Sequence, residues 1–436
     1  MPSADTGAPA VDRAGAVASS PSSDSVDTAT PLTKLRPGGP GFRRMSFALF
    51  AAGVSTFALL YSTQALLPAI SGDLGVSPDA ASWSVSAATF GLALGVVPLS
   101  ALSERFGRRT MMTASLTVAA VIALVVPFAP SLGALIALRG LQGVALAGTP
   151  ASAMAFLAEE VETKALVSAI GLFVAGNSIG GMSGRIVTGW AAQAWGWRAA
   201  LLTVGVMAVA CAVVFRLMVP RARHFVSRAV GPRALARTVA GHLSNPLLCR
   251  LYAIGGLFMM VFGAVYTVIG YRLVDRPFSL PQGIVGSIFV IYLVGTVSSA
   301  AAGRLVGRLG RRGALYLAVG TTAAGLLVSL ADSLAAVLVG LVLITAGFFA
   351  GHAVASSSVS RAAETARAQA SALYQSAYYV GSSIGGALGA AAFHAAGWPA
   401  TVALGLLALA AAAAVTLYAT RKAVVERRRL SVRAAA

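Results

Sequence analysis

Residues 82–109, SWSVSAATFGLALGVVPLSALSERFGRR, join an apolar stretch of membrane-spanning length to a short loop dense in arginine. A helix needs about 20 mostly apolar residues to cross the hydrocarbon core of a bilayer, which is roughly 30 Å thick. Stretches of this length recur along the chain, whose 436 residues are 57% hydrophobic and only 11% charged. The sequence therefore predicts an all-α, polytopic membrane protein.

Twelve stretches are long and apolar enough to form transmembrane helices. None alternates apolar and polar positions as the strands of a transmembrane barrel do, so helices are the expected element. We predict the spans at residues 46–70, 82–102, 110–128, 132–155, 165–191, 197–218, 248–272, 281–303, 313–331, 334–357, 367–394 and 398–420.

The formal charge of +19 is distributed unevenly among the loops. Arginines follow the second and eighth predicted spans, fill the central stretch and end the chain, whereas the alternate loops are nearly free of Lys and Arg. This asymmetry follows the positive-inside rule and indicates a multi-pass protein of the cell inner membrane with both termini in the cytoplasm. Because the basic residues form no single patch, we expect contact with membrane lipid and none with nucleic acid.

The chain divides into five expected regions. Residues 1–44 are rich in Ser, Ala, Thr, Pro and Gly without the apolar core of a signal peptide, so we expect a disordered cytoplasmic tail. Two six-helix bundles at 45–218 and 248–420 follow. We expect a basic cytoplasmic linker at 219–247 to join them, and a basic cytoplasmic tail at 421–436 to end the chain.

Two segments of the first bundle return in the second. Glu-Arg-Phe-Gly-Arg-Arg at 104–109 returns as Gly-Arg-Leu-Gly-Arg-Arg at 307–312, and Gly-Asn-Ser-Ile-Gly-Gly at 176–181 returns as Gly-Ser-Ser-Ile-Gly-Gly at 381–386. The two offsets are nearly equal, and transporters are often built from repeated halves with the substrate site between them. The repeat predicts two pseudo-symmetric halves.

Residues 100–109, Ser-Ala-Leu-Ser-Glu-Arg-Phe-Gly-Arg-Arg, resemble the signature loop of the major facilitator superfamily. The Arg-Gly-Leu-Gln-Gly stretch at 139–143 resembles the fourth-helix motif of its proton-coupled members. The first span around Tyr61 and Gln64, and the glycine-rich fifth span at 176–184, are similar to the drug and sugar efflux branch, which includes arabinose-type permeases. The resemblance implies a secondary transporter that works by alternating access, with proton-coupled efflux of a small organic solute.

The sequence departs from the family pattern in three places. Ser100 and Glu104 replace glycine and aspartate in the loop, and Gly307 removes the acid from its second copy. The fifth span lacks the Gly-Pro pair of typical drug antiporters. Its glycine spacing, as in Gly176 with Gly180, predicts close helix packing, with a sliding seam between the halves as the functional alternative.

The signature loop is a candidate gate. Glu104 could pair with an arginine or a helix N-terminus of the opposite half and so favour the state closed to the cytoplasm. A tight turn whose arginines contact lipid headgroups is the purely structural alternative. The gating candidates are Glu104, Arg105, Gly107, Arg108 and Arg109, with Arg308, Gly310, Arg311 and Arg312 in the second copy.

Arg139 and Arg185 lie inside predicted spans, where an arginine costs roughly 2.5–3.5 kcal/mol at the bilayer centre on insertion scales. No acid lies clearly inside a span, so backbone carbonyls, Gln64, Asn177 or water could solvate them. Alternatively, they give the cavity a positive potential that suits an anionic substrate, or Arg139 takes part in proton coupling.

His352 is the histidine that lies well inside a span, and histidine titrates near neutral pH. It is a candidate for proton coupling, with a hydrogen bond to Ser356 as the structural alternative. The remaining candidates for substrate binding are polar or aromatic side chains of the first, fourth, fifth and eleventh spans, which could line a mixed cavity: Tyr61, Gln64, Gln142, Asn177, Tyr374, Gln375 and Tyr378.

Two directions of transport stay open, efflux and the uptake of a small organic anion. A polytopic membrane enzyme is the more remote alternative, because no nucleophile-base cluster, metal-spaced histidine set or nucleotide loop is found. Cys211 and Cys249 lack the spacing of metal ligands. We expect a monomer without metal or cofactor, whose partners are a small-molecule substrate, protons and lipid.

Overall fold

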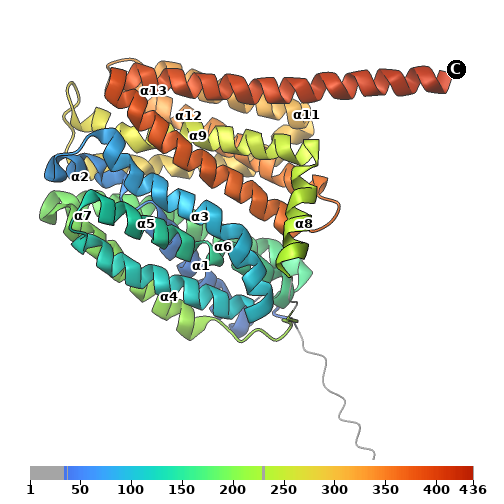
Figure 1. Cartoon of the computed structure of the whole chain (residues 1–436), viewed down its shortest axis with the longest axis horizontal. Coiled ribbons are helices and arrows are strands. Elements are labelled where there is room, and N and C mark those ends of the chain that lie inside the picture. The colour runs from blue at the N-terminus through green and yellow to red at the C-terminus, as the bar shows by residue number, and fades with distance from the viewer. Residues whose placement is uncertain (1–33, 37, 228–230, 436) are drawn as a thin grey trace, which may run out of the picture. The chain divides into compact units, whose positions relative to one another are not determined.

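The structure is a computed structural model that describes residues 34–36, 38–227 and 231–435. From residue 34 onward the chain forms one compact unit. Within the described residues, nine helices are long and apolar enough to cross a membrane. Three of them break at residues with non-helical backbone angles, at Gly196, at Gly310 and at 396–397. Each of the three makes two passes, so the predicted twelve transmembrane helices in two six-helix halves are confirmed (Figure 1).

Helices of the first half are drawn from blue to green in Figure 1. The helix α1 is followed by Tyr61, whose backbone angles are not helical. The chain then continues into a short 3-10 helix, η1. The elements are α1 (Pro40–Leu60), η1 (Gln64–Leu66), α2 (Leu67–Leu74), α3 (Pro78–Phe106), α4 (Arg108–Val125), η2 (Val126–Phe128), α5 (Leu132–Leu146), α6 (Gly148–Glu160) and α7 (Thr163–Met218).

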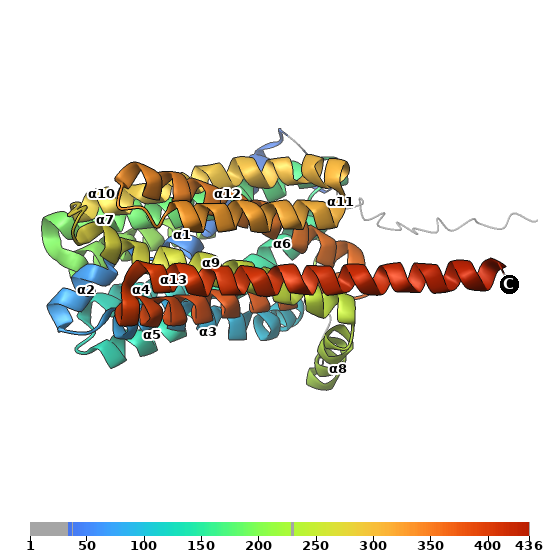
Figure 2. The ribbon, with the colours of Figure 1, turned by 90° about the horizontal axis from the view of Figure 1, so that it is seen from above.

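Helices of the second half, drawn from yellow to red, lie beside the first half in Figure 1 and overlap it in Figure 2. Along the chain, α8 (Pro232–Leu243) connects the two halves, and it runs across the ends of the other helices. The elements of the second half are α9 (Pro246–Val274), α10 (Gln282–Ser287), η3 (Ile288–Ile291), α11 (Tyr292–Val328), α12 (Leu334–Ala362) and α13 (Arg367–Ala435).

The repeat is visible in the backbone. Gly107 and Gly310, which occupy matching positions of the repeated loop, have φ angles of 94° and 70°. A residue with a Cβ atom pays roughly 1–2 kcal/mol in this left-handed region, so glycine is favoured at both turns.

The glycine-rich segments pack within each half. A Cβ atom at Gly180 would collide with the carbonyl oxygen of Val54 in α1, and one at Gly385 would collide with that of Met260 in α9. Close backbone approach of this kind is what small residues permit in lipid. These two contacts lie within a half, but the second segment also reaches across the halves, where the Ser383 hydroxyl donates to the carbonyl oxygen of Ser86 in α3 at 2.9 Å. The sliding seam therefore stays a prediction.

Two predicted boundaries need correction. The tail expected at 1–44 is too long, because α1 begins at Pro40 and Leu35 pairs with Val161 in an isolated bridge. Proline is well suited to the first turn of a helix, where its missing N–H has no partner to lose. Residues 1–33 lie outside the described part of the chain. The linker at 219–247 contains α8, and α13 continues into the stretch expected as a basic tail.

Hydrogen bonds join the halves at the end opposite the basic loops. The Tyr271 hydroxyl in α9 donates to the carbonyl oxygen of Leu67 in α2 at 3.0 Å. The backbone N–H of Gly283 in α10 donates to Oε1 of Gln193 in α7 at 2.9 Å. These contacts seal the interface between the halves at this end.

Candidate functional site

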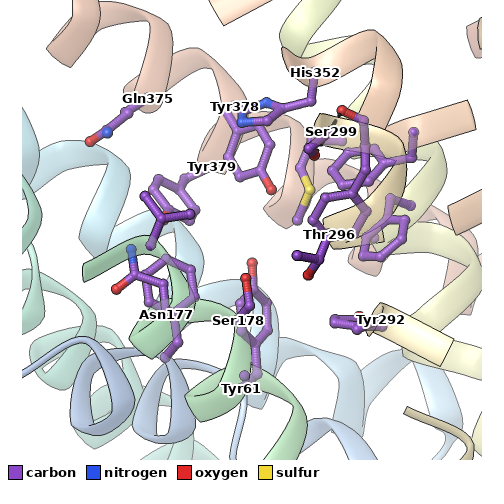
Figure 3. A pocket seen from close by; sticks show the side chains of 18 of the residues that line it. Tyr61, Asn177, Ser178, Tyr292, Thr296, Ser299, His352, Gln375, Tyr378 and Tyr379 are labelled. Carbon is purple, nitrogen blue, oxygen red and sulfur yellow. Dashed lines mark hydrogen bonds between the residues drawn. The ribbon is translucent and has the colours of Figure 1, made fainter. Parts of the chain in front are cut away.

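A cavity of about 420 Å³ lies between the two halves. Side chains of α1, η1 and α7 line it from the first half, and those of α9, α11, α12 and α13 from the second. Figure 3 shows Tyr61 and Asn177 facing Tyr378 and His352 across it. None of the described residues that line it is Asp or Glu.

Arg185 is the cation of this lining. Its side chain is buried, and its Nε donates to Oε1 of Gln64 at 2.8 Å. Its Nη1 donates to the carbonyl oxygen of Gly181, one turn earlier in α7. A guanidinium has five N–H donors, and Nη2 has no hydrogen-bond partner among the described residues. Donors are thus left for a ligand in the cavity.

Three aromatic rings surround the Arg185 guanidinium. Its Cζ lies 4.3 Å from the ring centre of Tyr61, 4.8 Å from that of Phe289 and 4.9 Å from that of Tyr292. Ring faces attract a cation without neutralising it. Because no carboxylate of the described chain forms an ion pair with Arg185, the cavity keeps a positive charge.

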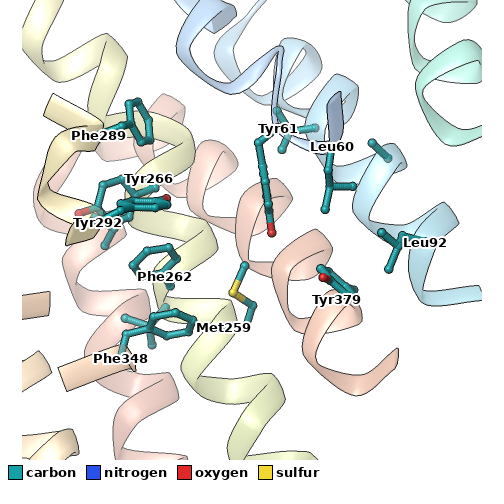
Figure 4. Close-up of a cluster of buried hydrophobic side chains, with 14 of the residues drawn as sticks. Leu60, Tyr61, Leu92, Met259, Phe262, Tyr266, Phe289, Tyr292, Phe348 and Tyr379 are labelled. Atoms are coloured by element: carbon teal, nitrogen blue, oxygen red, sulfur yellow. The ribbon is translucent and has the colours of Figure 1, made fainter. Parts of the chain in front are cut away.

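The second half supplies an aromatic wall. The rings of Phe262 and Phe348 are stacked with centres 4.0 Å apart and planes 19° apart. His352 continues the series, 6.1 Å from Phe348 and within 16° of its plane. Figure 4 shows Phe262 and Phe348 on the side of the cluster opposite Tyr61 and Leu60.

His352 is held from behind by Tyr374. Its Nδ1 lies 3.0 Å from the Tyr374 hydroxyl, and the Tyr374 side chain itself is not part of the cavity lining. The alternative of a bond from His352 to Ser356 is wrong, since the Ser356 hydroxyl donates to the carbonyl oxygen of Ala353 instead. A helical serine readily bonds to the backbone of the preceding turn.

Arg139 is fully buried away from the cavity, which corrects the expectation that it lines a substrate site. Nη1 and Nη2 donate to the carbonyl oxygens of Leu59 and Leu60 at 2.7 and 2.5 Å, and Nε donates to that of Ser84 at 3.1 Å. Leu59 and Leu60 end α1, so the cation neutralises the negative end of that helix.

Gln142 belongs to the same buried cluster. Its Oε1 accepts a hydrogen bond from Arg139, and its Nε2 donates to the carbonyl oxygen of Ala119 at 3.1 Å. It does not reach the cavity lining. The Arg139–Gln142 pair thus joins α5 to α1, α3 and α4.

The structure brings seven of the ten predicted binding candidates to the cavity and leaves out three. Those that line it are Tyr61, Gln64, Asn177, Arg185, His352, Gln375 and Tyr378; those that do not are Arg139, Gln142 and Tyr374. Sequence reasoning missed most of the aromatic wall. The adjacent pairs Phe348-Phe349 and Tyr378-Tyr379 inside two predicted spans were the available signal: Phe262, Tyr292, Phe348, Phe349 and Tyr379 all line the cavity.

In the signature loop, Glu104 makes a contact across the halves. Its Oε1 accepts from Nε2 of Gln369, in the first turn of α13, at 3.4 Å. The partner in the opposite half is thus an amide and not an arginine, while Nη2 of Arg108 in its own half lies 4.0 Å from Glu104 Oε1. Arg108 stays within its own half, with Nε 3.1 Å from Oε1 of Glu159 and Nη1 2.6 Å from the hydroxyl of Ser103.

The other loop arginines lie at the same end of the bundles, and none of them lines the cavity between the halves. They are Arg105 and Arg109 in the first copy, with Arg308, Arg311 and Arg312 in the second. Gly107 and Gly310 provide the turns that position them.

Two similar six-helix halves around a central cavity define a multi-pass membrane transporter. A model of the Major Facilitator Superfamily matches residues 45–279 and 251–435. The chain belongs to this superfamily.

Two bacterial proteins are similar along most of their length. The MFS-type transporter YybF of Bacillus subtilis is 41% identical over 358 residues, which cover 82% of this chain and 89% of that protein. The inner membrane transport protein YnfM of Escherichia coli is 37% identical over 375 residues, which cover 86% and 90%. The named relatives are transporters, as the sequence predicts.

Solved structures share the fold. A bacterial homolog of the human lysosomal transporter Spinster, inward-facing and unoccupied, superposes with a TM-score of 0.72 at 15% identity, over 88% of this chain and 97% of that one. The human organic anion transporter MFSD10 gives a TM-score of 0.67 at 16% identity, over 88% and 100%.

Proposed function

We propose that this transporter moves a small organic anion across the inner membrane by alternating access. The observation that carries the proposal is Arg185, a buried cation that lines the cavity without a carboxylate beside it. An anion that enters the cavity gains a charge-assisted hydrogen bond, which is worth about 1.5–3 kcal/mol. A neutral solute of the same shape gains only an ordinary one.

The state described is sealed at the end opposite the basic loops. With the basic loops in the cytoplasm, as the positive-inside rule predicts, the closed gate lies at the periplasmic end, and the long Glu104–Gln369 contact of 3.4 Å joins the halves at the cytoplasmic end. The contacts of Tyr271 with Leu67, and of Gly283 with Gln193, form the closed gate. They must break when the cavity opens to the other side.

We propose efflux as the direction. An interior-negative membrane potential favours the exit of an anion by about 2.3 kcal/mol per elementary charge for each 100 mV. Export therefore needs no coupling ion, whereas uptake of the same anion needs one. The absence of Asp and Glu from the described cavity lining favours the direction that the potential already drives.

Proton-coupled efflux is the second candidate. It is favoured by His352, which lines the cavity and shares a hydrogen bond with Tyr374. A histidine can take up and release a proton near neutral pH, so it could exchange a proton for the substrate.

Efflux from loaded proteoliposomes tests both candidates. The probe is labelled 3-phenylpropane-1-sulfonate, because a sulfonate stays charged and does not leak through lipid as a neutral acid. We expect an interior-negative potential to accelerate its exit and a pH gradient to have little effect. Dependence on the pH gradient that His352→Gln abolishes would instead favour proton coupling. Equal exit with and without the protein would contradict the proposal.

A further inference from the structure

The two walls of the cavity differ in chemistry. The first half contributes the cation Arg185 with the amides of Gln64 and Asn177. The second half contributes mostly rings, and Phe262, Phe348 and His352 stand within 19° of their neighbours in one series. A ligand in this cavity therefore meets a cation on one side and ring surfaces on the other.

Aromatic rings already surround the Arg185 guanidinium. Tyr61, Phe289 and Tyr292 lie within 4.9 Å of its Cζ, so a ligand reaches the guanidinium through its remaining N–H groups. A carboxylate or sulfonate matches these donors in geometry and charge.

The body of the ligand then lies along the second half. Phe348 and Phe262 pack in parallel, whereas the Phe349 ring is turned by 86° and 87° relative to them. A flat ring can extend the parallel series by offset stacking or meet the turned ring edge to face, which adds about 0.5–1.5 kcal/mol beyond the burial of its area. A saturated ring of equal size lacks this contribution.

The geometry points to an aromatic anion as the substrate class: one planar ring with an oxyanion on a short arm. The oxyanion binds Arg185, and the ring packs against Phe348 and its neighbours. This inference rests on the proposed function and adds the preference for an aromatic body.

Binding of three matched probes to the full chain in nanodiscs tests the inference by calorimetry. They are 3-phenylpropanoate, 3-cyclohexylpropanoate and the neutral 3-phenylpropanamide. Simple apolar burial would favour the saturated ring, which is the more hydrophobic of the two acids. Stacking instead predicts that 3-phenylpropanoate binds about 2–12-fold more tightly than its saturated analogue.

Phe348→Leu should bring the ratio of the two acid affinities close to one. Phe128→Leu is the matched control, since Phe128 is 72% exposed and lies outside the cavity, and it should leave the ratio unchanged. The comparison of probes on the unmodified chain needs no variant, so it stands even where a variant fails to fold.

The outcomes separate the two proposals. Equal affinity of the two acids, or tighter binding of the saturated one, overturns the aromatic preference while anion binding stands. Equal affinity of 3-phenylpropanoate and its amide overturns the proposed anion function itself. A lack of any binding of 3-phenylpropanoate at millimolar concentration overturns both.

Discussion

Arg185 donates a hydrogen bond of 2.8 Å to Gln64, and this bond connects the cavity to the interface between the halves. The amide nitrogen of the same Gln64 donates to the hydroxyl of Thr267, in the second half, at 3.4 Å. An anion that draws the guanidinium away from Gln64 also disturbs the link to Thr267. We therefore expect substrate binding to weaken the closed end.

Replacing Gln64 should weaken the closed end. Gln64→Leu removes the bond to Thr267, and a net hydrogen bond is worth about 0.5–1.5 kcal/mol, so the outward-open population should rise up to about tenfold. Distances between spin labels at Ser131 and Ser333, measured after replacement of Cys211 and Cys249, report the change. An unaltered distance distribution would show that Gln64 has no part in the gate.

Arg139 should contribute to the stability of the folded protein. Arg139→Gln removes the donor to the carbonyl oxygens of Leu59, Leu60 and Ser84. Leu59 keeps the Ser62 hydroxyl as a donor and Ser84 lies within α3, so the Leu60 carbonyl is the one left unsatisfied. We expect a loss of about 1–3 kcal/mol, seen as a lower melting temperature.

Arg198→Gln is the control for Arg139. It removes a half-exposed ion pair of 2.6 Å with Asp73, and such pairs contribute about 0.2–1 kcal/mol. A normally stable Arg139→Gln variant that has lost transport would instead support the role of Arg139 in coupling.

Glu104 should favour the state closed to the basic-loop end. Glu104→Ala removes its contact with Gln369 across the halves, whereas Glu159→Ala removes a contact of Arg108 within one half. Because the Glu104 contact is long, we expect a modest shift, about two- to fivefold, toward the inward-facing state. Cysteine labelling from the cytoplasmic side measures it. The same labelling rate for both variants would argue against a gate at Glu104.

A side chain at Gly310 should destabilise the turn. Its φ of 70° predicts that Gly310→Ala lowers stability by about 1–2 kcal/mol. Gly303 lies in the regular part of α11, where a Cβ atom would meet no other atom within 4 Å. Gly303→Ala should therefore be neutral or stabilising by up to about 1 kcal/mol. A larger loss at Gly303 than at Gly310 in thermal unfolding would contradict this account.

The fold could be predicted because its main determinants are local. The length of an apolar stretch fixes a span, and the repeated loops around Gly107 and Gly310 fix the two halves. The helix α8 was missed because its polar composition resembles that of a plain linker. Six of its twelve residues are apolar, but three of these are alanine, and only its place across the bundle ends shows what it packs against.

The site could be predicted only in part. Arg139 and Arg185 were both predicted to lie inside spans, but the sequence offers no way to tell Arg139, which the end of α1 satisfies, from Arg185, which faces the cavity. That difference depends on where α1 stops, which is a tertiary feature. The aromatic wall around Phe348 likewise arises from four helices, α9, α11, α12 and α13.

Counterflow of labelled 3-phenylpropane-1-sulfonate in proteoliposomes tests the central claim most directly, since it requires a site that binds an anion and opens to each side in turn. We expect accumulation with the unmodified chain, at least about tenfold less with Arg185→Gln, and partial recovery with Arg185→Lys, which keeps the charge. Undiminished counterflow in Arg185→Gln would contradict the assignment of this arginine as the anion-binding group of the cavity.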